Sequence, residues 1–155
     1  MELRARETKT RKRHSTEAEF ENKVAARFKA RGYLSKHNRE EFEAGVPDHY
    51  VQGGRWIEFK VIGISGKRKV RPQRHMSPRQ VEWLDDLASH GESTFVCVQW
   101  QFNEGLPLAM IMDWRCFRDY GPMGLDDIMM HSNAGETGIN FIVDYVMGLD
   151  DGLTY

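Results

Sequence analysis

The chain lacks several patterns on which small proteins often depend. It contains only two cysteines, Cys97 and Cys116. Neither belongs to a CxxC pair or has a histidine at zinc-ligand spacing, so no zinc site and no disulfide is predicted. We expect both to be reduced thiols in the core of a cytoplasmic protein. The six histidines form no HNH or HExxH pattern.

Long apolar segments are also missing. No run of 18 apolar residues is present, and no apolar segment follows the basic start, so we expect neither a membrane span nor secretion. Residues 63–67, GISGK, do not complete the GxxxxGK[ST] phosphate loop, and no nucleotide cofactor is expected. With 155 residues, of which 40% are hydrophobic, the chain should form one domain around one core.

Charge is distributed unevenly, although the net charge is only −1. Residues 1–79 carry 20 basic and 10 acidic side chains, a balance of +10, whereas residues 80–155 carry 2 and 13, a balance of −11. From residue 60 to residue 79 there are seven basic and no acidic residues. Such basic segments are typical of phosphate binding. The predicted DNA-binding residues are Lys67, Arg68, Lys69, Arg71, Arg74 and Arg79, with Arg11, Lys12 and Arg13 in a flexible arm.

The most informative segment is residues 45–60, GVPDHYVQGGRWIEFK. Hydrolysis of a phosphodiester needs charge stabilisation by hard cations, which carboxylate oxygens bind well. Asp48 and Glu58 can supply those oxygens. Lys60 lies two positions after Glu58, so on a strand both side chains share one face and the ammonium lies beside the metal. Phe59, between them, should point into the core.

The length of the hairpin loop decides whether this site can form. A two-residue Gly53-Gly54 turn would place Asp48 and Glu58 on opposite faces of the sheet. A three-residue loop that also includes Gln52 pairs Val51 with Arg55 and Asp48 with Glu58. We therefore predict the odd-length loop, or a bulge with the same effect. His49 alternates with Asp48 and should lie on the other face.

Two helices flank the predicted hairpin. Residues 16–31 form an amphipathic pattern that begins at Ser15 or Thr16 and stops at Gly32, and Glu21 beside its apolar stripe can point toward the hairpin. Residues 77–90 begin with Ser-Pro and are stopped by Gly91. Residues 94–101 and 108–114 then form two strands around a turn. The predicted order is helix, three strands, helix, two strands.

These residues resemble the PD-(D/E)XK nuclease superfamily, and in particular the virus-type VRR-Nuc enzymes and the archaeal-type Holliday-junction resolvases. The match covers about residues 16–114. Asp48 matches the motif aspartate, and Glu58 and Lys60 match the ExK. Glu21 matches the helix glutamate, and the Ser-Pro-x-Gln pattern that ends at Gln80 is similar to that of the second VRR-Nuc helix. The resemblance implies an α/β, restriction-endonuclease-like αβββαβ core with a mixed central sheet flanked by helices.

The resemblance also implies a mechanism and partners. Asp48, Glu58 and the Phe59 carbonyl would ligate Mg²⁺, for which Mn²⁺ should substitute, with Glu21 as an outer ligand. Lys60 and Gln80 would position water or phosphate. The implied protein is a homodimeric endonuclease of viral or phage type, which acts in DNA replication, recombination or repair and cuts four-way or other branched junctions. RNA as a substrate is not excluded by the residues.

Three segments follow from these patterns: a basic arm (1–15), a nuclease core (16–120) and a C-terminal extension (121–155). The extension contains an apolar run at residues 139–147 that either completes the core or forms a dimer surface.

Two functions stay open. The chain is a metal-dependent DNA endonuclease, or a catalytically silent DNA-binding or interaction module with the nuclease fold. Intact Asp48, Glu58 and Lys60 favour the enzyme.

Overall fold

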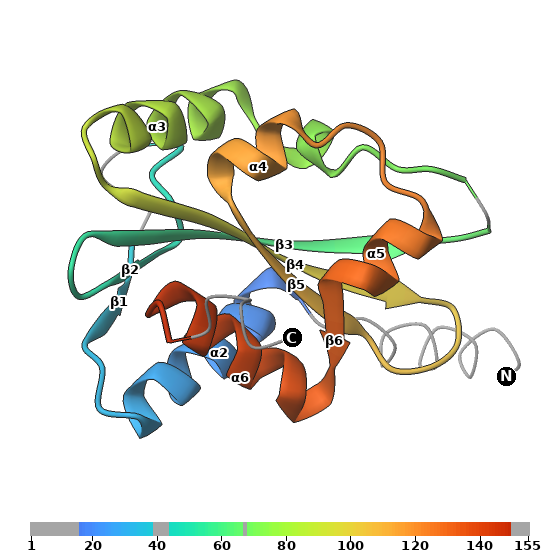
Figure 1. The fold of residues 1–155 in the computed structure, drawn as a ribbon, viewed down its shortest axis with the longest axis horizontal. Coiled ribbons are helices and arrows are strands. Elements are labelled where there is room, and N and C mark those ends of the chain that lie inside the picture. The colour runs from blue at the N-terminus through green and yellow to red at the C-terminus, as the bar shows by residue number, and fades with distance from the viewer. Residues whose placement is uncertain (1–15, 39–43, 67, 150–155) are drawn as a thin grey trace, which may run out of the picture.

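The computed structural model describes residues 16–38, 44–66 and 68–149. At its centre is a six-stranded sheet in the order β1-β2-β3-β4-β5-β6 (Figure 1). Neighbouring strands are antiparallel except β3 and β4, which are parallel. The mixed sheet with flanking helices confirms the predicted fold class. The strands are β1 (Ser35–His37), β2 (His49–Val51), β3 (Arg55–Ile64), β4 (Ser93–Phe102), β5 (Leu108–Asp113) and β6 (Ser132–Ala134).

Both predicted helices form. The helices are α2 (Glu17–Ala30), α3 (Pro78–Ser89), α4 (Trp114–Asp119), α5 (Leu125–His131) and α6 (Gly135–Val146). Thr16 caps α2, because its side-chain oxygen accepts a hydrogen bond from Glu19 N at 3.1 Å. The helix ends at Ala30, and Gly32 just beyond it has a φ of +82°, which is open to glycine but strained for other residues.

One predicted strand ends earlier than expected. Trp114 was expected to end the strand that follows the turn, but it is the first residue of α4. The preceding Asp113 caps this helix by accepting a hydrogen bond from Arg115 N at 2.9 Å. The cap turns the chain out of the sheet, and Trp114 is buried beneath the new helix.

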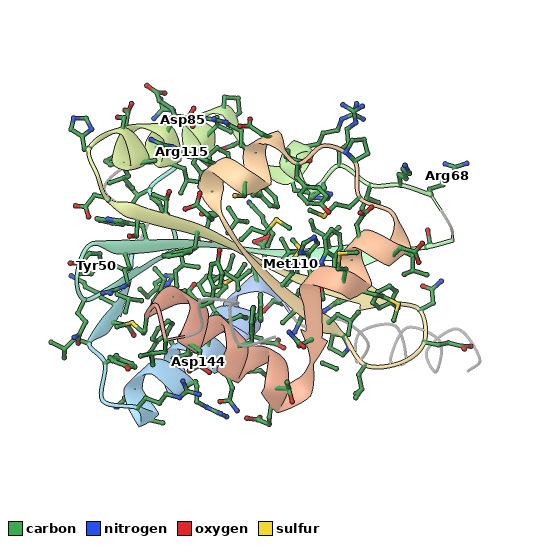
Figure 2. All side chains as sticks on the ribbon, in the orientation of Figure 1. Tyr50, Arg68, Asp85, Met110, Arg115 and Asp144 are labelled. Carbon is green, nitrogen blue, oxygen red and sulfur yellow. The ribbon has the colours of Figure 1, made fainter. Side chains whose placement is uncertain are left out.

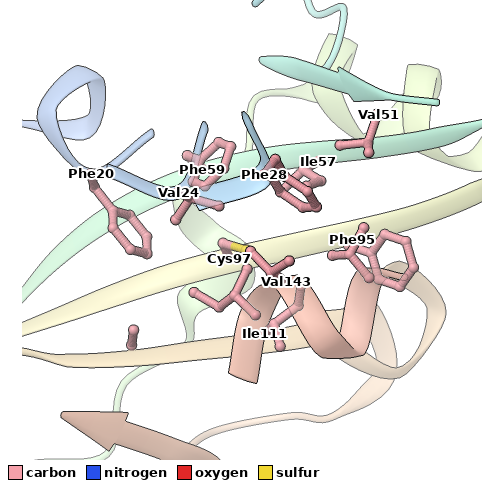
Figure 3. Packing of buried hydrophobic residues seen from close by; sticks show 13 residues of the cluster. Phe20, Val24, Phe28, Val51, Ile57, Phe59, Phe95, Cys97, Ile111 and Val143 are labelled. Carbon is pink, nitrogen blue, oxygen red and sulfur yellow. The ribbon is translucent and has the colours of Figure 1, made fainter. Parts of the chain in front are cut away.

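The helices cover both faces of the sheet. In Figure 1, α2 and α6 lie on one side, and α3 and α4 lie on the other. Because side chains alternate along a strand, the central strands supply both layers of the core. On the α2 side, Phe20, Val24 and Phe28 pack against Ile57 and Phe59 of β3 (Figure 3). On the α3 side the core is completed by buried residues of β3, β4, β5, α3, α4 and α5, among them Ile62, Leu84, Val96, Trp100, Met110, Phe117 and Ile128.

The C-terminal segment contributes to this core. Ile142, Val143 and Val146 of α6 are at most 3% exposed and pack in the same cluster as α2. β6 adds the sixth strand beside β5. One expectation for the cysteines was wrong: Cys97 is buried in β4, but Cys116 is exposed. Trp114 and Phe117 occupy the inward face of α4 and leave Cys116 outside.

Among the described residues, every helix is too short or too polar to reach across a lipid bilayer. The longest of them, α2, has 14 residues.

The loop between β2 and β3 generates a test of the fold. Gly53 and Gly54 have φ values of +89° and +73°, whereas Gly63 in β3 has an ordinary φ and nothing within 4 Å of an added Cβ. We expect Gly54→Ala to lower the free energy of unfolding by about 1–2 kcal/mol, because the left-handed backbone strains an L-residue. Gly63→Ala, the matched control, should leave it unchanged or raise it by up to about 1 kcal/mol. Urea denaturation measures both, and equal effects would contradict the strained loop.

Candidate active site

The β2–β3 hairpin brings the predicted carboxylates to one face. Val51 pairs with Arg55, Tyr50 with Trp56 and His49 with Ile57, so three residues connect the strands. This register confirms the predicted odd-length loop. One step further along it, Asp48 comes opposite Glu58, and directly opposed residues on antiparallel strands have Cβ atoms about 5 Å apart.

Asp48 is fixed to β3 by the backbone. Its Oδ2 accepts a hydrogen bond from Phe59 N at 2.8 Å. The Phe59 side chain is 1% exposed and packs edge-on against Phe20 of α2, on the other face of the sheet, as predicted. Its carbonyl, the predicted backbone ligand, belongs to the peptide that joins Phe59 to Lys60. Asp48 therefore reaches the backbone between the two residues of the ExK motif.

Glu58, Lys60 and Gln80 form one hydrogen-bonded group on the α3 face. Gln80 Nε2 donates to Glu58 Oε1 at 2.8 Å. Lys60 Nζ donates to Gln80 Oε1 at 3.1 Å and lies 3.9 Å from Glu58 Oε1. The Glu58 and Lys60 side chains are only 2% and 9% exposed, so a carboxyl group and an ammonium lie side by side, largely shielded from solvent.

Gln80 is held in position by the start of α3. Its Oε1 also accepts a hydrogen bond from Ser77 N at 2.9 Å, and its own N donates to Ser77 Oγ at 3.2 Å, which is a capping box. Two donors on Oε1 and a carboxylate on Nε2 fix the orientation of the amide. The S-x-x-Q pattern at residues 77–80 is the sequence signal for this arrangement.

Burial disfavours the ionised form of both carboxyl groups. Burial raises the pKa of Glu58 well above its usual range, and the neighbouring Asp48 charge raises it further, while Lys60 opposes the shift. Burial also raises the pKa of Asp48, against the lowering effect of the Phe59 N–H. Ionising both groups in a buried place is costly unless a positive charge lies between them.

These features fit a hard divalent cation. Glu58 Oε2 is buried and has no hydrogen-bond partner within the described part of the chain. This oxygen lies opposite Asp48, a second carboxyl group whose pKa is raised. Together they offer the carboxylate oxygens that Mg²⁺ prefers as ligands. Asp48 and Glu58 would hold the ion, and its charge would favour their ionised forms.

Glu21 lies inside the protein, as its position beside the apolar stripe predicts, but its partners are two histidines. Its Oε2 accepts hydrogen bonds from His49 Nδ1 at 2.8 Å and His37 Nδ1 at 2.5 Å. His49 lies on the α2 face of the sheet, whereas Glu58 lies on the α3 face, as expected from alternation. The Glu21 charge still contributes to the raised pKa of Asp48. The structure therefore brings together Asp48, Glu58, Lys60 and Gln80. Glu21 lies beside this group and is hydrogen-bonded to the two imidazoles.

The basic segment connects two sides of this group. It follows the end of β3 at Ile64 and returns at α3, where Arg79 precedes Gln80. Figure 2 shows Arg68 at the end of the molecule far from Tyr50, so the middle of the segment extends away from the hairpin. Arg68, Lys69, Arg71, Arg74 and Arg79 are all exposed, whereas Lys67, Arg11, Lys12 and Arg13 lie outside the described residues.

Comparisons with known proteins find likeness in structure but not in sequence. No protein-family model matches the chain, and no curated protein matches it significantly. Among solved structures, the chain is similar to Hjc, a Holliday junction resolvase from the archaeal hyperthermophile Archaeoglobus fulgidus. The match has a TM-score of 0.48 and 13% sequence identity, and it covers 80% of this chain and 98% of that chain.

The raised pKa of Glu58 gives a test by stability. Between the ordinary pKa of 4.5 and the higher native pKa, the folded chain binds more protons than the unfolded chain, so stability falls as pH rises through that window. With a metal chelator present, we expect Glu58→Gln to lose less stability than the wild type as the pH rises. The variant should also be more stable than the wild type at pH 8, because the neutral amide needs no counter-charge. Thermal unfolding across pH measures the difference.

Mg²⁺ should stabilise the wild type and not Glu58→Gln, because only the carboxylate binds the ion well. Glu82→Gln, which changes an exposed acid on α3, is the matched control. A pH profile of Glu58→Gln that coincides with that of the wild type would contradict the buried pair.

Proposed function

We propose that the protein is a Mg²⁺-dependent endonuclease that hydrolyses phosphodiester bonds in DNA. The observation that carries this proposal is the β2–β3 register, which brings Asp48 opposite Glu58, together with a buried Glu58 oxygen that has no hydrogen-bond partner among the described residues. Two such carboxylates beside a positioned ammonium serve a reaction in which negative charge develops on phosphate.

Each residue has a distinct part in the proposed reaction. Asp48 and Glu58 hold the divalent ion, which when bound lowers the pKa of a coordinated water and neutralises phosphate charge. Lys60, directed by Gln80 Oε1, donates a hydrogen bond to a water or phosphate oxygen at the site. Gln80 keeps Glu58 Oε1 in place and leaves Oε2 for the ion. Mn²⁺ should replace Mg²⁺, because both accept carboxylate oxygens.

The exposed basic segment supports a nucleic acid as substrate. Arg68, Lys69 and Arg71 can contact phosphates of the DNA at a distance from the scissile bond, without reading bases. A single domain has little surface for reading a long sequence, so we propose selection by structure, with branched DNA or a four-way junction as the preferred substrate. A homodimer would match the two equivalent strands of such a junction. The activity would serve DNA replication, recombination or repair in the cytoplasm.

Cleavage of labelled DNA tests the site. Linear duplex, flap and four-way junction are incubated with Mg²⁺ or Mn²⁺ and the wild type, Asp48→Asn or Lys60→Ala. We expect each variant to cut at least about 100-fold more slowly, the scale on which loss of one charge-stabilising group acts. Asp86→Asn, an exposed acid on α3, should retain the wild-type rate. Chelation of the metal should abolish cutting.

The outcomes separate the two candidate functions. Undiminished cutting by Asp48→Asn would place the reaction elsewhere in the molecule. Binding of DNA by all variants without any cutting would identify a silent module.

The basic segment gives a second test through salt dependence. We expect Arg68→Ala and Arg71→Ala each to reduce the slope of log affinity against log salt by about one, because each removes one phosphate contact. Lys29→Ala on α2 removes an exposed charge from the other face and should leave the slope unchanged. Fluorescence anisotropy with duplex DNA at several salt concentrations measures all three. Identical slopes would show that DNA binds elsewhere.

A further inference from the structure

A second group of metal-ligand residues lies on the α2 face of the sheet. His37 of β1 and His49 of β2 are directly paired across the two strands, so their side chains share a face. Glu21 of α2 reaches down to both of them, and one carboxylate oxygen lies within 2.8 Å of both Nδ1 atoms. The ligand atoms of the three residues all lie within 4.8 Å of one another.

The surroundings of this trio distinguish it from a surface contact. The side chains of Glu21 and His49 are 6% and 3% exposed, whereas that of His37 is 56% exposed. His49 Nε2 is buried, and among the described residues it has no hydrogen-bond partner. All three residues line an open hollow of about 470 Å³ between α2 and the start of the sheet. The group is thus fixed by packing on one side and reachable from solvent on the other.

The donor set selects a different ion from that of the active site. Asp48 and Glu58 offer only oxygen, which suits Mg²⁺, whereas two imidazoles with one carboxylate suit divalent transition metals. Ligands bound at about 2.0–2.1 Å in tetrahedral geometry lie about 3.4 Å apart. The separations from Glu21 Oε2 to the two Nδ1 atoms, 2.5 and 2.8 Å, would need to widen by less than about 1 Å.

We propose that Glu21, His37 and His49 form a site for one divalent transition-metal ion of the zinc or cobalt class. The ion takes the place of the proton between each Nδ1 and Glu21, and each neutral imidazole ligand then carries its one proton on Nε2. Three elements, α2, β1 and β2, are then tied together through one point. His49 directly follows Asp48, so the ion fixes the end of β2 from which Asp48 projects. The site is separate from the Mg²⁺ site in ligands and in face.

Cobalt binding to the whole chain tests the proposal in the absence of DNA. The tag-free protein is stripped with chelator and titrated with Co²⁺, and both calorimetry and the visible absorption of the ion are recorded. The double variant Asp48→Asn/Glu58→Gln removes the proposed Mg²⁺ site. The variant His37→Ala removes the exposed ligand of the trio, and because His37 is exposed this substitution leaves the core intact. His75→Ala changes an exposed histidine outside the trio and is the matched control.

We expect the wild type, the double variant and His75→Ala each to bind one equivalent of Co²⁺ with the intense visible absorption of an ion of low coordination number. In His37→Ala, the affinity should fall at least about 10-fold, the smallest effect expected even from outer partners of a metal site. Zn²⁺ should displace the cobalt signal. Loss of the signal in the double variant, or wild-type binding by His37→Ala, would overturn the proposal. Because no cleavage is measured, failure of the nuclease proposal would leave this result unchanged.

Discussion

The register between β2 and β3 is the constraint on which the candidate site depends. A strand has a side-chain period of two, so one residue more or less in the loop would move Asp48 to the opposite face from Glu58. The three-residue connection at residues 52–54 makes the two motif carboxylates neighbours. It also turns His49 and Val51 toward α2, where both are buried. The hydrophobic core and the site therefore require the same register, and burial of Val51 helps to hold Asp48 in place.

Gln80 joins the site to the helix that covers it. One amide closes the capping box of α3, accepts from Lys60 and donates to Glu58. The start of the helix and the geometry of the site are thus one hydrogen-bonded unit. A substitution at Gln80 would disturb the helix end and the candidate site together, so its effect on the site could not be separated from its effect on stability. Lys60 contacts the helix end only through the Gln80 amide, so it is the cleaner position for separating the two.

The sequence predicted the central part of the fold because the signals there are local and strong. Caps and stops at Thr16, Gly32, Ser77 and Gly91 bound the two long helices, and the glycine loop decided the hairpin register. The segment from α4 to α6 was less predictable, since α4 has six residues and β6 has three, too few for a periodic pattern. The apolar run at residues 139–147 allowed two environments, and only the packing of α6 on α2 shows that it enters the core.

Within the site, the residues of the motif could be identified but their partners could not. Glu21 was expected to face inward, and it does, but His37 belongs to a strand of three residues with no alternating pattern. Its pairing with His49 follows from the approach of β1 to β2, which no local signal encodes. The route of the basic segment was likewise undetermined, because exposed charge does not fix the path of a loop.

The parallel pairing of β3 with β4 also affects when the site can form during folding. Glu58 pairs with Val96, and Lys60 with Val98, through a crossover that contains α3. The strand that carries the ExK motif therefore gains its central neighbour only after a long segment of chain has closed upon it, which is an entropic cost paid before the contacts are made. The β2–β3 hairpin can pair early, but Gln80 reaches Glu58 only once the crossover has closed. A nascent chain that ends before β4 would carry the complete motif and still lack the arrangement that gives the motif its chemistry.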